Sequence, residues 1–237
     1  MIPKLIHQYW DGEPSESHKK YMDSIKSKNP EFKYFLWNKD FVIDSCSGHI
    51  LTEYLKEAKP GVIASDIARV ILLDHIGGIY LDSDMVSIRS IPDHILIHNT
   101  FACYENEFYY GQTIANGALG SIANAMFIKK LVSEILKYKI EKISKVLSGD
   151  SWQLFGPRLW TKIFFDLRCR DIMVYPSWYF IPNHYCNTKE ENNNTGYITD
   201  HVWKSNYPKP PKEWCEEYIL SRKFPEIEHM KQFDNEQ

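Results

Sequence analysis

The sequence predicts a single α/β domain over residues 1–237, and three observations support this. The chain of 237 residues is 43% hydrophobic and 25% charged, an ordinary balance for a globular domain with a sizeable core. Short apolar runs typical of strands alternate with amphipathic stretches of helical period. The apolar run Ile79–Leu81 leads directly into two carboxylates, Asp82 and Asp84, which marks a candidate site at the end of a strand.

Charge and cysteine content argue against several classes of partner and location. The net charge of −3 provides no basic surface for nucleic acid. No apolar run reaches the roughly 18–20 residues that span a bilayer, so we expect no transmembrane segment. The five cysteines are odd in number and lack metal-ligand spacing, so we expect reduced thiols and a cytoplasmic protein.

The first expected strand covers the apolar run Leu5–Trp10 and ends at the turn pair Asp11-Gly12. Trp10 at its end can offer a flat face to a nucleobase, or it can be an ordinary core residue. His7 is expected to be a hydrogen-bonded interior histidine rather than a metal ligand.

The next elements alternate between helix and strand. Residues 17–29 form an amphipathic pattern that ends before a proline, and residues 32–37 suggest the second strand. Asn38 can cap a further helical stretch, and residues 49–58 predict another helix.

The helix expected over Ala64–His75 is the most informative one. Ser65 or Asp66 can cap its start, and a double glycine at 77–78 ends it. Asp66 and Arg69 are three residues apart and therefore share a helical face. Such a pair is usually a surface salt bridge worth under about 1 kcal/mol. It also provides the acceptors and donors that a polyhydroxyl ligand needs.

Asp82 and Asp84 would project from one face if the strand continues through Ser83. Two carboxylates this close resist ionising together, and a hard divalent cation such as Mg²⁺ or Mn²⁺ relieves their repulsion. The alternative is an ordinary turn at a strand end, where Asp and Ser are common.

Two more strands are expected in the middle of the chain. One covers Thr100–Tyr104, and a polar, aromatic loop follows it. The other covers Ile114–Gly120, whose glycines suggest breaks where a ligand approaches the backbone.

A long helical region is expected over Ala123–Val146, and its lysines form a basic face. This face is either a solvated surface or a point of attraction for an anionic acceptor or a membrane surface, so peripheral membrane contact stays open.

The C-terminal third carries weaker signals. Trp152–Pro157 is expected to be a turn into a helix over 158–167, and the proline-containing segments 174–176 and 178–182 to lie at a sheet edge. His201 lies among aromatic residues and is either structural or the imidazole that completes a Mn²⁺ shell. Residues 208–237 are expected to form a peripheral helix and tail.

Two blocks together resemble a known family. They are Ala64-Ser65-Asp66-Ile67-Ala68-Arg69 and Gly77-Gly78-Ile79-Tyr80-Leu81-Asp82-Ser83-Asp84. They resemble the core of the sugar-binding, DxD-containing glycosyltransferases, most closely glycosyltransferase family 32 and more distantly the glucosylating domains of large clostridial toxins. The resemblance implies a GT-A fold, an α/β fold with a mixed, mostly parallel central sheet flanked by helices, and retention of the anomeric configuration.

The resemblance also implies roles for particular residues. The metal ligands for Mn²⁺ or Mg²⁺ would be Asp82, Asp84 and His201. The catalytic set would be Asp66, Arg69 and Asp84. The donor-binding set would be Tyr9, Trp10, Asp66, Arg69, Asp82, Trp203, Lys204 and Ser205, with Trp10 stacked on the base.

The expected function is therefore metal-dependent, retaining transfer of a hexose or N-acetylhexosamine. The donor would be a nucleotide sugar, with a UDP-sugar favoured and a GDP-sugar possible, and the acceptor a glycan or another hydroxyl compound. Two alternatives stay open at this point. One is a DxD phosphotransferase or phosphatase, and the other is a non-catalytic module that binds nucleotide sugars or carbohydrate.

Overall fold

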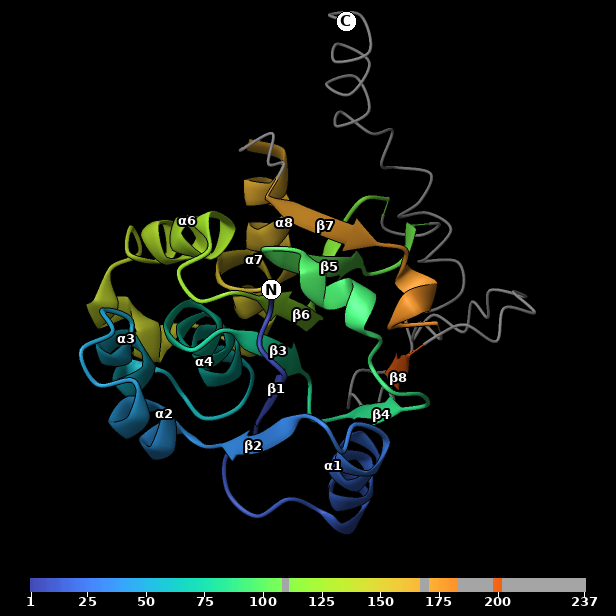
Figure 1. The fold of residues 1–237 in the computed structure, drawn as a ribbon. Coiled ribbons are helices and arrows are strands. Elements are labelled where there is room, and N and C mark those ends of the chain that lie inside the picture. The colour runs from blue at the N-terminus through green and yellow to red at the C-terminus, as the bar shows by residue number, and fades with distance from the viewer. Residues whose placement is uncertain (108–110, 167–170, 183–197, 202–237) are drawn as a thin grey trace, which may run out of the picture.

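The computed structural model describes residues 1–107, 111–166, 171–182 and 198–201, and its centre is a six-stranded sheet (Figure 1). The strand order is β2-β1-β3-β6-β5-β7. Three of the five pairings are parallel, and β6 is antiparallel to both of its neighbours. The expected mixed, mostly parallel sheet is confirmed. Its strands are β1 (Leu5–Tyr9), β2 (Lys33–Trp37), β3 (Gly78–Leu81), β5 (Thr100–Tyr104), β6 (Ile114–Ser121) and β7 (Ile172–Tyr175).

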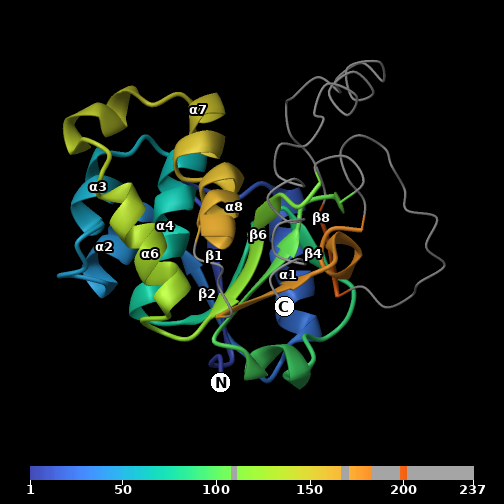
Figure 2. The ribbon, with the colours of Figure 1, turned by 90° about the horizontal axis from the view of Figure 1, so that it is seen from above.

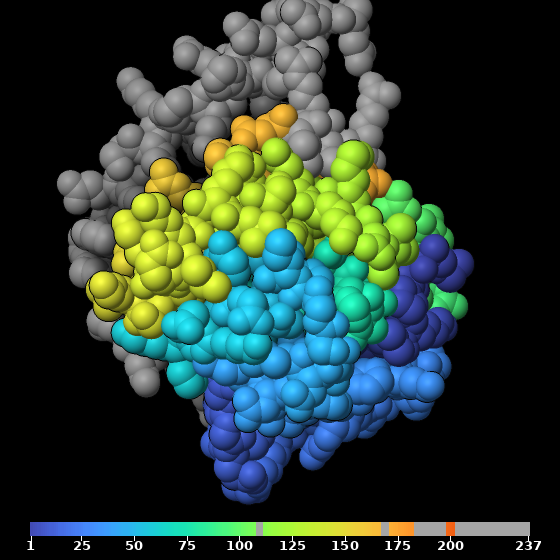
Figure 3. Space-filling model, turned by 90° about the vertical axis from the view of Figure 1, so that its left-hand side faces the viewer, coloured from blue at the N-terminus to red at the C-terminus, as the bar shows by residue number. Residues whose placement is uncertain are grey.

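Helices cover one face of this sheet almost completely, and a thinner layer covers the other (Figure 2). Figure 3 shows the outer surface of the thick layer, where the side chains of α2, α3 and α6 form a continuous wall. A separate apolar core lies on each face of the sheet. The helices are α1 (Glu16–Lys28), α2 (Lys39–Ser45), α3 (Thr52–Glu57), α4 (Val62–His75), α6 (Met126–Ile135), α7 (Ser148–Leu154) and α8 (Pro157–Asp166).

Helix α4 is buried on nearly all sides, because it packs between the sheet and the outer helices. It begins at Val62, directly after Gly61, whose φ of 96° suits a glycine. Ser65 and Asp66 therefore lie inside the helix, and the prediction that one of them caps it is wrong. This burial carries Asp66 and Arg69 into the interior of the protein.

The double glycine after α4 forms the sharp turn into β3. Gly77 and Gly78 have φ values of 75° and 112°. The imidazole of His7 packs against this turn, with Nε2 2.8 Å from the carbonyl oxygen of Gly77, while Nδ1 accepts a hydrogen bond from Trp37. Burial lowers the pKa of His7 to about 4, so the ring is neutral. The expected interior histidine is confirmed.

Gly78→Ala is expected to lower the free energy of unfolding by about 3 kcal/mol. The added Cβ would lie 2.8 Å from His7 Nε2 and 2.9 Å from the carbonyl oxygen of Leu5, at a φ that side chains rarely adopt. Urea unfolding measures the change. The matched control is Gly149→Ala in α7, whose Cβ meets no atom within 4 Å and which should be neutral or slightly stabilising. Equal midpoints for the wild type and Gly78→Ala would contradict this account of the turn.

Several sequence-based boundaries are wrong. The expected helix 123–146 is divided into α6 and a 3₁₀ helix, η2 (Ile140–Lys145). The expected helix 49–58 begins only at Thr52. The expected turn Trp152–Pro157 is confined to Phe155 and Gly156, between α7 and α8. Residues 178–182 contain no strand, since η3 (Ser177–Tyr179) lies there, whereas β7 does form a sheet edge as expected.

The lysines of the expected basic face are partly neutralised. Lys129 pairs with Asp74, and both Lys130 and Lys137 pair with Glu134. This favours an ion-paired, solvated surface over a membrane contact.

Other expectations concern membrane spans, cysteines and the tail. Within the described ranges, no helix is long and apolar enough to cross a membrane. Cys46 and Cys103 are buried free thiols, as expected. The other three cysteines and residues 208–237 lie outside the described residues.

A small second sheet lies beside the first and matters for the site. It pairs β4 (Met85–Ser87) with β8 (Thr199–His201) in antiparallel register. Met85 lies opposite His201, although 116 positions separate them in the sequence. This pairing brings the end of the described chain back to the residues that follow β3.

Candidate active site

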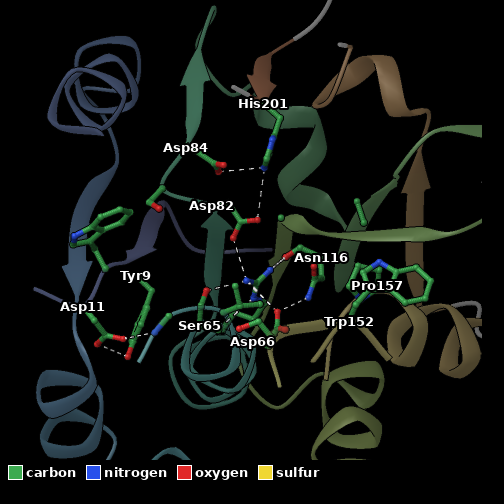
Figure 4. A pocket seen from close by; sticks show the side chains of 18 of the residues that line it. Tyr9, Asp11, Ser65, Asp66, Asp82, Asp84, Asn116, Trp152, Pro157 and His201 are labelled. Atoms are coloured by element: carbon green, nitrogen blue, oxygen red, sulfur yellow. Dashed lines mark hydrogen bonds and ion pairs between the residues drawn. The ribbon is translucent and has the colours of Figure 1, made fainter. Parts of the chain in front are cut away.

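A cavity of about 680 Å³ opens at the ends of the central strands and contains most of the predicted site residues (Figure 4). In Figure 4, Tyr9 and Asp11 lie at one end of it, and Trp152 and Pro157 lie at the other. The charged residues of the middle are Asp66, Arg69, Asp82, Asp84 and His201.

The two predicted carboxylates lie on a turn and not on a strand. β3 ends at Leu81 and β4 begins at Met85, and the amide of Met85 donates to the carbonyl oxygen of Asp82 at 3.1 Å. The strand therefore breaks at Ser83, and the alternative of a turn at the strand end is confirmed. The carboxylates still converge, because the turn directs both toward His201.

His201 completes a cluster of three potential metal ligands. Its Nε2 is 3.2 Å from Asp84 Oδ1 and 3.9 Å from Asp82 Oδ2, and one ligand atom from each residue lies within 4.8 Å of the others. Burial would lower the pKa of His201, but Asp84 and Asp82 outweigh it and raise it to about 10. Two carboxylates and one imidazole suit Mn²⁺ or Mg²⁺, so the donor set fits the predicted cation.

Arg69 is the central cation of the described site. Its Nη2 lies 3.1 Å from Asp82 Oδ1 and 3.2 Å from Asp66 Oδ1, and it donates to Ser65 Oγ at 2.9 Å. Its guanidinium also stacks 4.7 Å from the ring centre of Tyr80. Since Arg69 is 4% exposed and Asp66 3% exposed, the surface salt-bridge alternative is wrong.

Arg69 affects its two carboxylate partners differently. Burial would raise the pKa of Asp82, but Arg69 and His201 outweigh it and hold that pKa below its usual value. For Asp66, burial dominates and raises the pKa despite Arg69. Asp82 is thus kept ionised, as a metal ligand must be.

Asp66 is held by two residues that sequence reasoning did not assign to the site. Asn116 Nδ2 donates to Asp66 Oδ1 at 2.9 Å, and Ser151 Oγ donates to Asp66 Oδ2 at 2.6 Å. Arg69 in turn donates to the backbone carbonyl oxygen of Asn116. Three separate elements, α4, β6 and α7, therefore fix one carboxylate. No local signal marks Ser151, because its partner is 85 residues away.

Gly117 makes room for Asp82. β6 is one strand, but its pairing with β5 shifts register between Ala115 and Gly120, so the expected irregularity at its glycines is confirmed there. A Cβ on Gly117 would lie 2.6 Å from Asp82 Oδ2. The amide of Asp82 donates to the carbonyl oxygen of Gly117 at 2.8 Å. The group that lies close to the backbone of Gly117 is thus the carboxylate of Asp82.

Gly117→Ala is expected to reduce transfer activity by about 10²-fold, because a shift of about 1 Å in a reacting group can cost that much. The fold should persist, since the clash is with the movable end of a side chain. Initial rates and thermal melting measure the two effects. An unchanged rate would show that the position of Asp82 does not matter for the reaction.

The predicted base-binding residues Tyr9 and Trp10 also line the cavity. The Tyr9 hydroxyl donates to Asp11 Oδ1 at 2.7 Å, and the amide of Gly61 donates to Asp11 Oδ2 at 2.9 Å. The half-buried ring of Trp10 lies on the cavity wall, with its centre 4.2 Å from that of His18. Trp203, Lys204 and Ser205 lie outside the described residues.

Comparisons with known proteins give consistent matches. A family model described as "Glycosyltransferase sugar-binding region containing DXD motif" matches residues 15–102. An uncharacterized glycosyltransferase of Acanthamoeba polyphaga mimivirus is 27% identical over 215 residues, covering 87% of this chain and 83% of that protein. A mannosyl phosphorylinositol ceramide synthase of Saccharomyces cerevisiae is 25% identical over 150 residues, covering 58% of this chain and 36% of the yeast protein.

Solved structures show the same fold at low sequence identity. The ligand-free glycosyltransferase domain of the YGT toxin has a TM-score of 0.53 at 9% identity, covering 73% of this chain and 80% of that domain. The glycosyltransferase GlyE of Streptococcus pneumoniae has a TM-score of 0.52 at 16% identity, covering 93% of this chain and 61% of that protein.

Proposed function

We propose that this chain, a glycosyltransferase with the GT-A fold, transfers a hexose or N-acetylhexosamine from a nucleotide sugar to a glycan-type hydroxyl with retention of configuration. We propose a UDP-sugar as donor and Mn²⁺ or Mg²⁺ as cofactor. A GDP-sugar is the second choice. The named relatives are glycosyltransferases, so the phosphatase and non-catalytic alternatives are set aside.

The observation that carries the proposal is the three-ligand cluster inside the cavity. Asp82, Asp84 and His201 converge there beside the buried pair Asp66 and Arg69. The glycosyltransferase domain of the YGT toxin, which shares the fold with a TM-score of 0.50, has been crystallised with UDP. The name of the yeast relative contains a mannosyl group, so we include mannose among the candidate hexoses.

The site residues have separate roles in the proposed transfer. Asp82, Asp84 and His201 would hold the cation, which when bound neutralises the leaving diphosphate. Arg69 keeps Asp82 ionised and oriented, while Asp66 would accept hydrogen bonds from sugar hydroxyls. Trp10 would stack on the base.

The transfer itself requires no protein nucleophile. The acceptor oxygen would bond to the anomeric carbon on the face from which the phosphate oxygen leaves, and the hydroxyl proton would pass to that phosphate oxygen. From the family resemblance, we also propose Trp203, Lys204 and Ser205 near the diphosphate.

A thermal-shift screen of UDP- and GDP-sugars, each with and without Mn²⁺, tests the proposal. A ligand at 100 times its Kd stabilises the native state by about 2.7 kcal/mol. For a chain of this size we therefore expect a rise of roughly 5–10 °C in Tm with a UDP-sugar and Mn²⁺ together. No rise with any nucleotide sugar would contradict the proposed donor class.

A further inference from the structure

The far end of the cavity has a lining of its own, which the proposed donor does not use. Figure 4 shows Trp152 and Pro157 on the side opposite Tyr9 and Asp11. The order of the strands in the sheet agrees with this. Trp10 follows β1, Asp82 follows β3 and Glu105 follows β5, so the cavity extends across the sheet from Trp10 past Asp82 to Glu105. Trp152 and Pro157 line this far end, and the cavity lining also includes Glu105, which follows β5, and Ile181.

The donor's orientation determines what this end can hold. If the base lies on Trp10 and the diphosphate lies at Asp82 and Asp84, the transferred sugar lies beyond them, over Asp66. The acceptor hydroxyl must then reach the anomeric carbon from the side of the cavity that leads toward β5. This step rests on the proposed function.

The side chains there suit a sugar ring. Trp152 presents a half-buried indole, whose flat apolar face complements the C–H face of a pyranose. Pro157 and Ile181 add apolar surface. Glu105 is 8% exposed, and its amide donates to the carbonyl oxygen of Thr113 at 2.8 Å, which fixes its backbone. Its carboxylate can accept hydrogen bonds from hydroxyl groups.

The charge of the cavity favours an uncharged acceptor over an anionic one. Arg69 is the only lysine or arginine among its described lining residues. A divalent cation would offset the two diphosphate charges of a nucleotide sugar. The carboxylates among the described lining residues then outnumber the basic side chains, which disfavours an anionic headgroup. The acidic lining residues are Asp11, Asp66, Asp82, Asp84 and Glu105.

We propose that Trp152 and Glu105 form an acceptor subsite for an uncharged sugar ring, with the indole under the ring and the carboxylate bonded to its hydroxyls. This chain would then differ in acceptor from the yeast relative, which is named for a phosphorylated inositol lipid.

The test measures binding of the full chain, with Mn²⁺ and UDP, to an array of uncharged oligosaccharides and inositol-phosphate headgroups. The wild type should bind uncharged glycans, and Trp152→Ala and Glu105→Gln should each weaken this by at least about tenfold, or 1.4 kcal/mol. Trp178→Ala is the matched control, because Trp178 is half-buried but does not line the cavity. Calorimetry of UDP with Mn²⁺ should give the same Kd for all four proteins.

The remaining outcomes each contradict either the acceptor subsite or the proposed donor. Unchanged glycan binding in both variants, binding only to inositol phosphate, or no binding to the array would overturn the acceptor subsite. Weakened UDP binding in the variants would assign these residues to the donor and also overturn it. Absence of UDP binding in the wild type would instead refute the proposed UDP-sugar donor.

Discussion

Asp84→Ala is expected to abolish transfer, with a loss of about 10³-fold or more in initial rate, and to leave the fold intact. The loss corresponds to about 4 kcal/mol of transition-state stabilisation, a reasonable share for a metal ligand. Asp84 is partly exposed, and the contact shown for its carboxylate is with His201. Because His201 is 8% exposed and Asp84 is the strongest influence that raises its pKa, Asp84→Ala should lower the free energy of unfolding at neutral pH without unfolding the protein. Release of nucleoside diphosphate measures the rate, and thermal melting measures the fold.

Two comparisons make this result specific. Treating the wild type with EDTA should reproduce the loss, and Mn²⁺ should restore activity to the wild type but not to Asp84→Ala. Asp44→Ala, at an exposed helical carboxylate outside the cavity, should behave as the wild type does. Full activity of Asp84→Ala, or activity that survives EDTA, would refute metal-dependent transfer.

Arg69→Met is expected to have the largest effect on stability, lowering the free energy of unfolding by about 3–5 kcal/mol. The substitution leaves Asp66, which is 3% exposed, without its cation. Removing one partner from a buried ion pair typically costs this much. The pKa of Asp82 should also rise, because Arg69 is the strongest influence that lowers it. Urea unfolding measures the stability.

Arg69→Lys separates charge from geometry. Lysine keeps the positive charge but lacks the planar fork that reaches Asp66, Asp82 and the carbonyl oxygen of Asn116 together. It should recover part of the stability and little of the activity. If Arg69→Met unfolds at the wild-type urea concentration, the buried network contributes nothing to the fold.

Local patterns predicted those parts of the molecule that depend on neighbouring residues. Apolar runs located β1 and β3, and the double glycine located the turn between α4 and β3. The family resemblance then supplied the GT-A fold, which is confirmed. Ser65 has the local character of a cap, but the helix begins three residues earlier, at Val62, where the next two residues, Ile63 and Ala64, are buried.

The site was harder to predict because long-range pairing assembles it. Strand alternation would bring Asp82 and Asp84 together only if the strand continued through Ser83, and it is instead the turn that brings them together with His201. That approach depends on the pairing of β4 with β8, which no local signal reveals. Ser151 was missed for the same reason. Gly117 lay in a segment noted for its glycines, but only the folded chain shows that Asp82 occupies the space beside it.

The position of manganese in crystals grown with UDP and Mn²⁺ tests the central claim most directly. We predict anomalous density between Asp82, Asp84 and His201, in contact with the diphosphate oxygens. Manganese bound elsewhere, or a diphosphate located in the cavity without a cation at these three residues, would contradict the claim.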